Sequence, residues 1–145
     1  MIDLQKITDF IKKWEGCKLQ AYKPIATDPW TIGYGATGGD ISEITKWTLQ
    51  QAEEDLTNRC KFLYRKISSY PGTYQMTDNQ FIALVSLAYN IGLGAFLGST
   101  LLLKIMNYDS NIEIASEFGK WIHSGGKVIA GLVNRREAEK ELFLT

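Results

Sequence analysis

Residues 13–39 read KWEGCKLQAYKPIATDPWTIGYGATGG, and this stretch decides the fold. In front of it, apolar residues recur at helical spacing over residues 3–14, and Gly16 supplies a natural stop. Beyond that glycine, apolar and β-branched residues are mixed with prolines and glycines, a pattern typical of short strands joined by turns. The sequence therefore predicts an amphipathic helix that ends beside Glu15, followed by a small β region over residues 19–40.

Polar residues at characteristic spacings mark where the helices begin. Asp3 is the expected N-cap of the first helix. Thr48 with Gln51, and Thr77 with Gln80, both match the capping box, in which two side chains satisfy each other's backbone amides. The first pair opens a long helix, and the second precedes FIALVSLAYNIG, a nearly all-apolar run that predicts a buried central helix.

The remainder of the chain predicts turns and shorter helices. A glycine-rich turn follows the central helix, and Ser99 or Thr100 caps a short helix over LLLKIM. Two further helices are expected over residues 112–122 and 132–143, separated by a break at Gly125–Gly126. The predicted fold class is therefore α+β, mainly α.

Composition limits the classes of function. A chain of 145 residues holds one full hydrophobic core and is too short for two ordinary domains. Its formal net charge is zero with mixed signs, which argues against a nucleic-acid partner. Cys17 and Cys60, with one histidine, make neither a disulfide framework nor a typical zinc site, so both are expected as buried free thiols. No metal and no organic cofactor is predicted.

The N-terminus mixes acids and lysines with its apolar residues. It lacks the uninterrupted apolar run of a signal peptide, and no stretch approaches the length of a membrane-spanning helix. We therefore expect a protein made in the cytosol, without a signal peptide and without stable membrane insertion.

Glu15 is the strongest candidate for chemistry. At the end of a helix the unsatisfied carbonyls disfavour a charged carboxylate, and nearby aromatic side chains would desolvate it further. Both effects suit a general acid for glycoside cleavage near neutral pH, although a solvated surface acid is the plainer interpretation. A glycosidase usually needs a second group to activate water, and Asp28 near Thr31 is the candidate pair; an Asp before Pro is also an ordinary turn former.

Aromatic and polar residues elsewhere suit the binding of a sugar. Tyr22, Tyr34 and Phe96 offer flat apolar rings, and Asn90 offers a polar edge. The alternative for each ring is packing in the core.

Several separated motifs, in order along nearly the whole chain, resemble one family. EGCKLQAY followed by WTIGYG resembles the active-site segment of the phage-type lysozymes, glycoside hydrolase family 24. ALVSLAYNIGLGAFLGSTLL and EFGKWIHSGGKVIAGLVNRREAEKELF resemble the helical lobe of the same endolysins. The resemblance implies a lysozyme-like, two-lobed fold. We expect a single catalytic domain over residues 1–145, with a β lobe over about 1–47, a connecting helix over about 48–76 and a helical lobe over about 77–145.

The resemblance also implies a function and roles for residues. It implies a peptidoglycan muramidase that cuts the β-1,4 bond between N-acetylmuramic acid and N-acetylglucosamine and so lyses the host cell. Glu15 matches the family's general acid, and Thr31 matches the threonine that positions the attacking water. Asn90, Phe96 and Ser99 match the stretch that faces the glycan. The implied partners are the glycan strands and a holin-type release protein, and the enzyme is expected to act as a monomer.

The chain departs from the family pattern at two positions. Pro24 stands nine residues after Glu15, where most members have Asp or Cys, and Thr31 lies one residue further on than usual. Proline cannot act as a base, so Asp28 is the expected substitute, with Thr27 a weaker candidate. Ala36 stands where GYG is usually followed by His. Two alternatives stay open: a lytic transglycosylase that uses Glu15 alone, and an inactive peptidoglycan-binding module.

Overall fold

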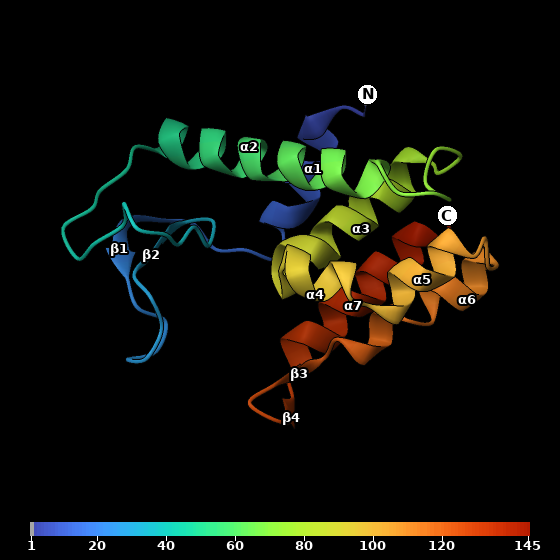
Figure 1. Cartoon of the computed structure of the whole chain (residues 1–145). Helices are drawn as coiled ribbons and strands as arrows, with labels where there is room; N and C mark the ends of the chain where they lie inside the picture. The colour runs from blue at the N-terminus through green and yellow to red at the C-terminus, as the bar shows by residue number, and fades with distance from the viewer. Residues whose placement is uncertain (1) are drawn as a thin grey trace. The chain divides into compact units, whose positions relative to one another are not determined.

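The computed structural model describes residues 2–145, and Figure 1 traces its elements along the chain. It divides into two compact units. The N-terminal unit is Asp3–Lys61, and the helical unit consists of Ile2 and Phe62–Thr145. The division falls inside helix α2 (Leu49–Ser68), whereas the sequence suggested boundaries near residues 47 and 76.

Helix α1 (Leu4–Lys12) opens the N-terminal unit as expected. The Asp3 side chain accepts a hydrogen bond from the Gln5 backbone N–H at 3.0 Å, which confirms it as the N-cap. Ile7 and Ile11, one turn apart, have no exposed surface. The helix ends at Lys12, two residues earlier than predicted, so Glu15 follows the helix rather than closing it.

The β region of the N-terminal unit is smaller than predicted. Strand β1 (Lys18–Tyr22) pairs antiparallel with β2 (Thr31–Gly33), and an irregularity lies between the two register points that join them. A small apolar cluster packs here, formed by Ala21, Ile32 and Ala36 with the partly buried Trp30, Ile41 and Trp47. These residues form the small hydrophobic core of the sheet.

Both predicted capping boxes are present. Thr48 Oγ1 accepts from the Gln51 N–H at 3.1 Å and starts α2, while Gln51 Oε1 accepts from the Thr48 N–H at 2.8 Å. The Thr77–Gln80 pair does the same for α3 (Asp78–Ile91). Residues 80–88 of α3 are buried at every position, so the predicted central helix is confirmed.

The helical unit continues with short elements around α3. They are α4 (Leu93–Leu97), α5 (Thr100–Met106), α6 (Asn111–Ala115), the 3₁₀ helix η1 (Phe118–Lys120), strands β3 (His123–Ser124) and β4 (Lys127–Val128), and α7 (Ala130–Phe143). Helix α7 packs against α3 and begins two residues before the predicted start. Ser99 caps α5 by accepting from the Leu102 N–H at 3.2 Å, as one of the two expected caps.

Two expectations for this unit are wrong, and a third is met in an unexpected form. The glycine-rich turn after α3 contains the short helix α4. The helix predicted over residues 112–122 is broken into α6 and η1. The expected break at Gly125–Gly126 is a hairpin between β3 and β4, with both glycines at positive φ (58° and 78°), as a two-residue hairpin turn of type I′ requires. β structure is therefore not confined to residues 19–40.

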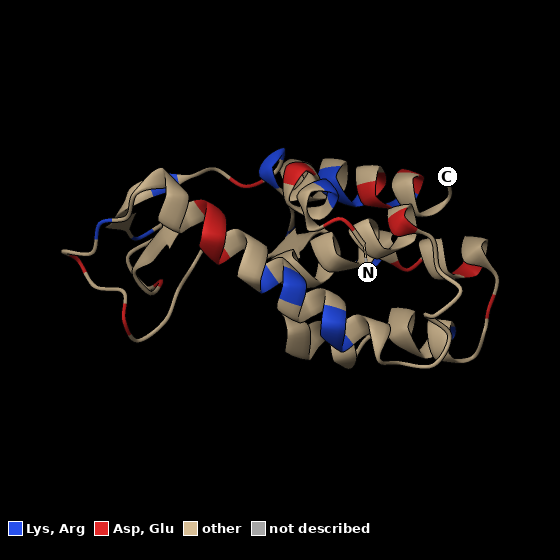
Figure 2. Ribbon diagram, turned by 90° about the horizontal axis from the view of Figure 1, so that it is seen from above, with Lys and Arg blue, Asp and Glu red and all other residues tan. Residues whose placement is uncertain are grey.

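The charged residues follow the helices in an ordered way. In α2 the acids gather toward its start and the bases toward its end (Figure 2), with Arg65 and Lys66 in the last turn. This arrangement complements the helix dipole.

Over residues 2–145, every helix is too short or too polar to cross a lipid bilayer.

Candidate functional site

Glu15 lies in the short connection between α1 and β1. Its backbone N–H donates to the Ile11 carbonyl at 3.0 Å, so the residue is still tied to the last turn of α1. Its side chain is half-buried. A Cβ placed on Gly35 would lie 3.7 Å from Glu15 Oε2, so the carboxylate rests over the backbone of the GYG turn. Gly35 has φ +95°, a conformation that favours glycine.

Thr31 begins strand β2 opposite Tyr22. Its hydroxyl donates to the Pro29 carbonyl at 3.0 Å, and the residue is only 6% exposed. Because the hydroxyl proton is committed to Pro29, the oxygen is left to accept a hydrogen bond from water. That suits a group that orients a water molecule, since such a group must leave the nucleophilic lone pair free.

Asp28 lies in the loop between β1 and β2. Its backbone N–H donates to the Ile25 carbonyl at 3.0 Å, so the residue closes a turn, as the plainer interpretation of Asp-Pro expected. The side chain is half-buried, whereas Pro24 is exposed. The three predicted catalytic residues, Glu15, Asp28 and Thr31, thus belong to the N-terminal unit.

Tyr34 is not available as a flat platform for a sugar. It is 7% exposed, and its hydroxyl donates to Glu53 Oε1 at 3.2 Å. The Lys12 ammonium lies 5.6 Å from the centroid of its ring and forms an ion pair with Glu53. Burial, followed by the charges of Cys17 and Glu53 and hydrogen bonds with both, raises the pKa of Tyr34 to about 12. We therefore correct the stacking role to a packed, hydrogen-bonded one.

Tyr22 remains a candidate for contact with substrate. It closes β1, is half-buried, and has the Lys18 ammonium 6.0 Å from its ring centroid.

The two cysteines differ from each other. Cys17 is only half-buried, contrary to expectation, whereas Cys60 is buried, and burial with the charge of Asp55 raises its pKa to about 12.

The predicted glycan-facing residues of the helical unit separate by burial. Asn90, at the end of α3, is exposed, and its Oδ1 accepts from Arg136 Nη1 at 2.9 Å. Phe96 has no exposed surface. Ser99 is 4% exposed, and its hydroxyl donates to the Phe96 carbonyl at 2.6 Å. Direct contact with a glycan is open to Asn90 alone of these three; the other two build the turn that follows it.

Sequence reasoning missed a buried ionic network that holds Asn90 in place. Glu139, with no exposed surface, accepts from the Ser86 hydroxyl at 2.5 Å and pairs with Arg136 Nε at 2.6 Å and with Arg135 Nε at 3.4 Å. Burial raises the pKa of Glu139, and the two guanidinium groups and the Ser86 hydroxyl oppose that rise. The i+3 and i+4 spacings in NRREAEKE were the available signal.

Asn90 also lines a pocket of about 580 Å³ with Ile91, Lys120, Trp121, His123, Ser124 and Leu132.

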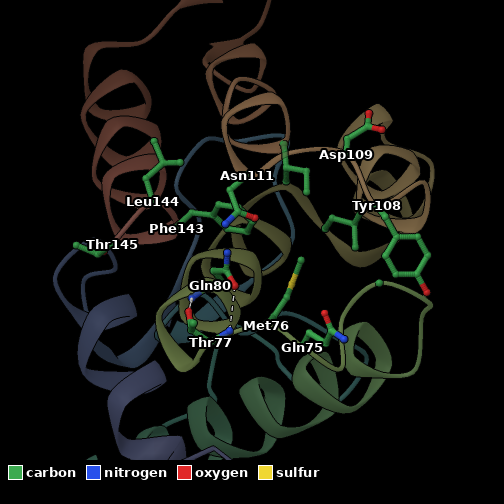
Figure 3. Close-up of a pocket in the computed structure, with 13 residues that line it drawn as sticks. Gln75, Met76, Thr77, Gln80, Tyr108, Asp109, Asn111, Phe143, Leu144 and Thr145 are labelled. Carbon is green, nitrogen blue, oxygen red and sulfur yellow. Dashed lines mark hydrogen bonds between the residues drawn. The ribbon is translucent and has the colours of Figure 1, made fainter.

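A second pocket, of about 360 Å³, lies at the start of α3 and is drawn in Figure 3. Thr77 and Gln80 line it, and the dashed lines mark their capping box. Asn90 stands at the opposite end of α3, and no predicted site residue lines this second pocket. Over residues 2–145, no group of three or more His, Cys, Asp and Glu is placed to hold a metal ion.

Comparison with known proteins decides the family. Residues 12–139, most of the chain, match the family described as phage lysozyme. The chain belongs to the phage lysozyme family. The resemblance and the mainly helical, lysozyme-like fold expected from the sequence are thereby confirmed.

Individual relatives and a solved structure support the same family assignment. The chain is 44% identical over 136 residues to an endolysin of Bacillus phage PZA, covering 93% of this chain and 52% of the relative. It is 37% identical over 142 residues to an endolysin of Acyrthosiphon pisum secondary endosymbiont phage 1, covering 92% of this chain and 91% of the relative. The muramidase domain of SpmX from Asticaccaulis excentricus superposes with a TM-score of 0.84 at 32% identity, over 97% of this chain and 96% of that one. The chain spans about half the length of the Bacillus phage endolysins that it matches.

Proposed function

We propose that this chain is a peptidoglycan muramidase of an endolysin, which hydrolyses the β-1,4 bond between N-acetylmuramic acid and N-acetylglucosamine and so lyses the host cell. The observation that carries the proposal is Glu15 in the connection after α1 with its carboxylate over the GYG turn, in a chain of the phage lysozyme family. Relatives named endolysin and a structural neighbour named a muramidase domain support it.

Glu15 acts as the general acid in this mechanism. It donates a proton to the glycosidic oxygen as the bond to the leaving sugar breaks. The Thr31 oxygen accepts a hydrogen bond from the attacking water, because its own proton is donated to Pro29. Asp28 is the carboxylate that accepts the one proton that the attacking water releases, or that stabilises the developing positive charge, in place of the group that Pro24 lacks. The chemistry needs no metal or cofactor.

Asn90 and Tyr22 supply substrate contacts in this proposal. Asn90 is exposed and oriented by Arg136, and it lines a pocket with Trp121. An amide beside an indole suits a sugar ring with an N-acetyl group, since the amide hydrogen-bonds and the indole covers an apolar face.

Substitution of Glu15 tests the assignment. Glu15→Gln should lower the release of reducing ends from peptidoglycan by about 10²- to 10⁴-fold, because the amide cannot donate the proton as an acid does. Glu43→Gln, an exposed acid of the same unit, is the matched control and should keep full activity. Full lysis by Glu15→Gln would refute the assignment.

Asp28 is tested separately. Asp28→Ala should lower the rate by about 10²-fold if this carboxylate shares the chemistry, whereas a near-normal rate would remove Asp28 from the site. Mass spectrometry of the fragments should show reducing N-acetylmuramic acid ends. Anhydro ends would mean transglycosylation, and sugar binding without new ends would mean an inactive binding module.

We further propose that the enzyme reaches the wall with the help of a holin-type membrane protein and acts as a monomer. Expression in bacteria with and without a holin should give lysis in the first case only. Light scattering on the purified protein should give the mass of one chain.

A further inference from the structure

Tyr34 is the centre of a contact set that joins three elements of the N-terminal unit. The Tyr34 cluster consists of Lys12, Cys17, Tyr34 and Glu53. The Tyr34 hydroxyl donates to Glu53 of α2 at 3.2 Å, and Lys12 of α1 lies 5.6 Å from the ring centroid. Lys12 and Glu53 also form an ion pair, so the three side chains close a triangle of contacts. The cluster therefore ties the GYG turn to both helices.

The segment that carries Glu15 is held by this cluster at both ends. Lys12 lies three residues before Glu15, and Cys17 lies two residues after it. The Cys17 side chain forms a hydrogen bond with Tyr34 and, with Glu53, contributes to the raised pKa of that tyrosine. Both ends of the segment thus meet the same side chain.

The middle of the segment meets the residue next to Tyr34. Glu15 Oε2 lies 3.7 Å from the position that a Cβ on Gly35 would occupy. A shift of Tyr34 would move the backbone of Gly35, because the two are joined by one peptide bond. The Glu15 carboxylate therefore lies against the residue that directly follows Tyr34 in the turn.

We propose that Tyr34, held by Lys12 and Glu53, is a positioning residue that sets the Glu15 carboxylate against the GYG turn. The inference rests on the proposed function, because it assigns how the general acid is held. It replaces the expectation that Tyr34 stacks on a sugar, which its 7% exposure does not allow.

Magnitudes separate this role from a purely structural one. The Lys12 and Glu53 side chains are 27% and 38% exposed, and an ion pair that is this open to water adds little to the stability of the fold. By contrast, misplacing a catalytic group by about 1 Å can lower a rate by about 10²-fold. Loosening the cluster should therefore change the turnover number much more than the stability.

The test measures kcat, KM and the unfolding temperature for variants of the cluster. Tyr34→Phe keeps the ring and removes the hydroxyl, and Lys12→Met removes the charge; kcat for reducing-end release should fall about fivefold and about tenfold, with KM within about twofold of wild type. Lys12→Arg keeps the charge and should stay within about twofold of wild type in kcat. Asp3→Ala removes the N-cap at the far end of α1 and is the control for a loss of stability: it should lower the unfolding temperature and leave kcat unchanged.

The outcomes are distinct. If Tyr34→Phe and Lys12→Met both keep the wild-type kcat, or if Asp3→Ala lowers kcat equally, the positioning role is overturned. If Tyr34→Phe is silent while Tyr34→Leu raises KM, Tyr34 stacks on the sugar after all and the inference is wrong. None of these results touches the proposed function, which fails if Glu15→Gln is active or if the fragments carry no reducing N-acetylmuramic acid ends.

Discussion

The two units of this protein differ in the contacts that stabilise each of them internally. In the helical unit, residues 80–88 of α3 are buried at every position. In the N-terminal unit, the cluster under the sheet contains three buried residues, Ala21, Ile32 and Ala36, with partly buried neighbours. The proposed catalytic residues thus lie in the unit that contains this small apolar cluster.

Ion pairs show the same contrast. The Arg135–Glu139 and Asp55–Arg59 pairs share the i,i+4 spacing on a helix. The Arg135 and Glu139 side chains are 4% and 0% exposed, whereas those of Asp55 and Arg59 are 23% and 37% exposed. A buried charge depends on its partner, because water cannot replace it, whereas an exposed pair exchanges with water at little loss. Substitutions in the helical unit should therefore act mainly on stability, and substitutions near Glu15 mainly on activity.

The largest expected effect comes from the buried carboxylate. Glu139→Gln should lower the free energy of unfolding by about 3–5 kcal/mol, because two buried guanidinium groups lose their shared counter-charge. The matched change Asp55→Asn should cost about 1 kcal/mol or less, since that pair is open to water. Urea unfolding of both variants measures the difference. Equal losses would remove the contrast between the units.

A pair of glycines gives the next largest effect. Gly72 has φ +90°, and a Cβ there would collide with the Ile105 carbonyl in the helical unit. Gly72→Ala should destabilise by about 2–4 kcal/mol, combining backbone strain with that collision. Gly35→Ala meets Glu15 Oε2 at ordinary contact distance, so only its φ of +95° opposes it.

Gly35→Ala should therefore destabilise by about 1 kcal/mol while lowering lysis strongly, because it lies under the proposed general acid. Thermal unfolding and reducing-end release, measured on both variants, separate the two effects. A fully active Gly35→Ala would show that the GYG turn does not support Glu15.

The smallest expected effect is a pH dependence in the helical unit. Burial alone would raise the pKa of Glu117, but hydrogen bonds and charges from Lys120 and Lys104 outweigh it and lower the pKa below its ordinary value of 4.5. A lowered pKa in the folded state gives stability that is present above the unfolded pKa and is lost as pH falls through the folded one. The stability advantage of wild type over Glu117→Gln should therefore shrink between about pH 5 and pH 3. Denaturant unfolding at several pH values measures it, with the exposed Glu141→Gln as control. An advantage that does not change with pH would contradict the role of the two lysines.

Local signals in the sequence predicted the starts of four helices, α1, α2, α3 and α5, correctly. Asp3, Thr48, Thr77 and Ser99 all cap helices, because a cap depends on residues two or three positions away. The short β3–β4 hairpin and the break between α6 and η1 were not predicted, since elements of two or three residues carry too few residues to set up a periodic pattern.

The sequence by itself determined the caps, the buried central helix and the family, since these depend on spacing and order along the chain. Only the tertiary structure decided what each side chain meets. The Tyr34 hydroxyl reaches Glu53, 19 residues away, and the Ser86 hydroxyl reaches Glu139, 53 residues away. Aromatic residues such as Tyr34 and Phe96 suit a binding surface and a core equally well in sequence, because periodicity shows which residues share a face but not what covers it. The burial of these two side chains shows that they pack inside the protein. Glu15, by contrast, lies over the GYG turn that contains Tyr34.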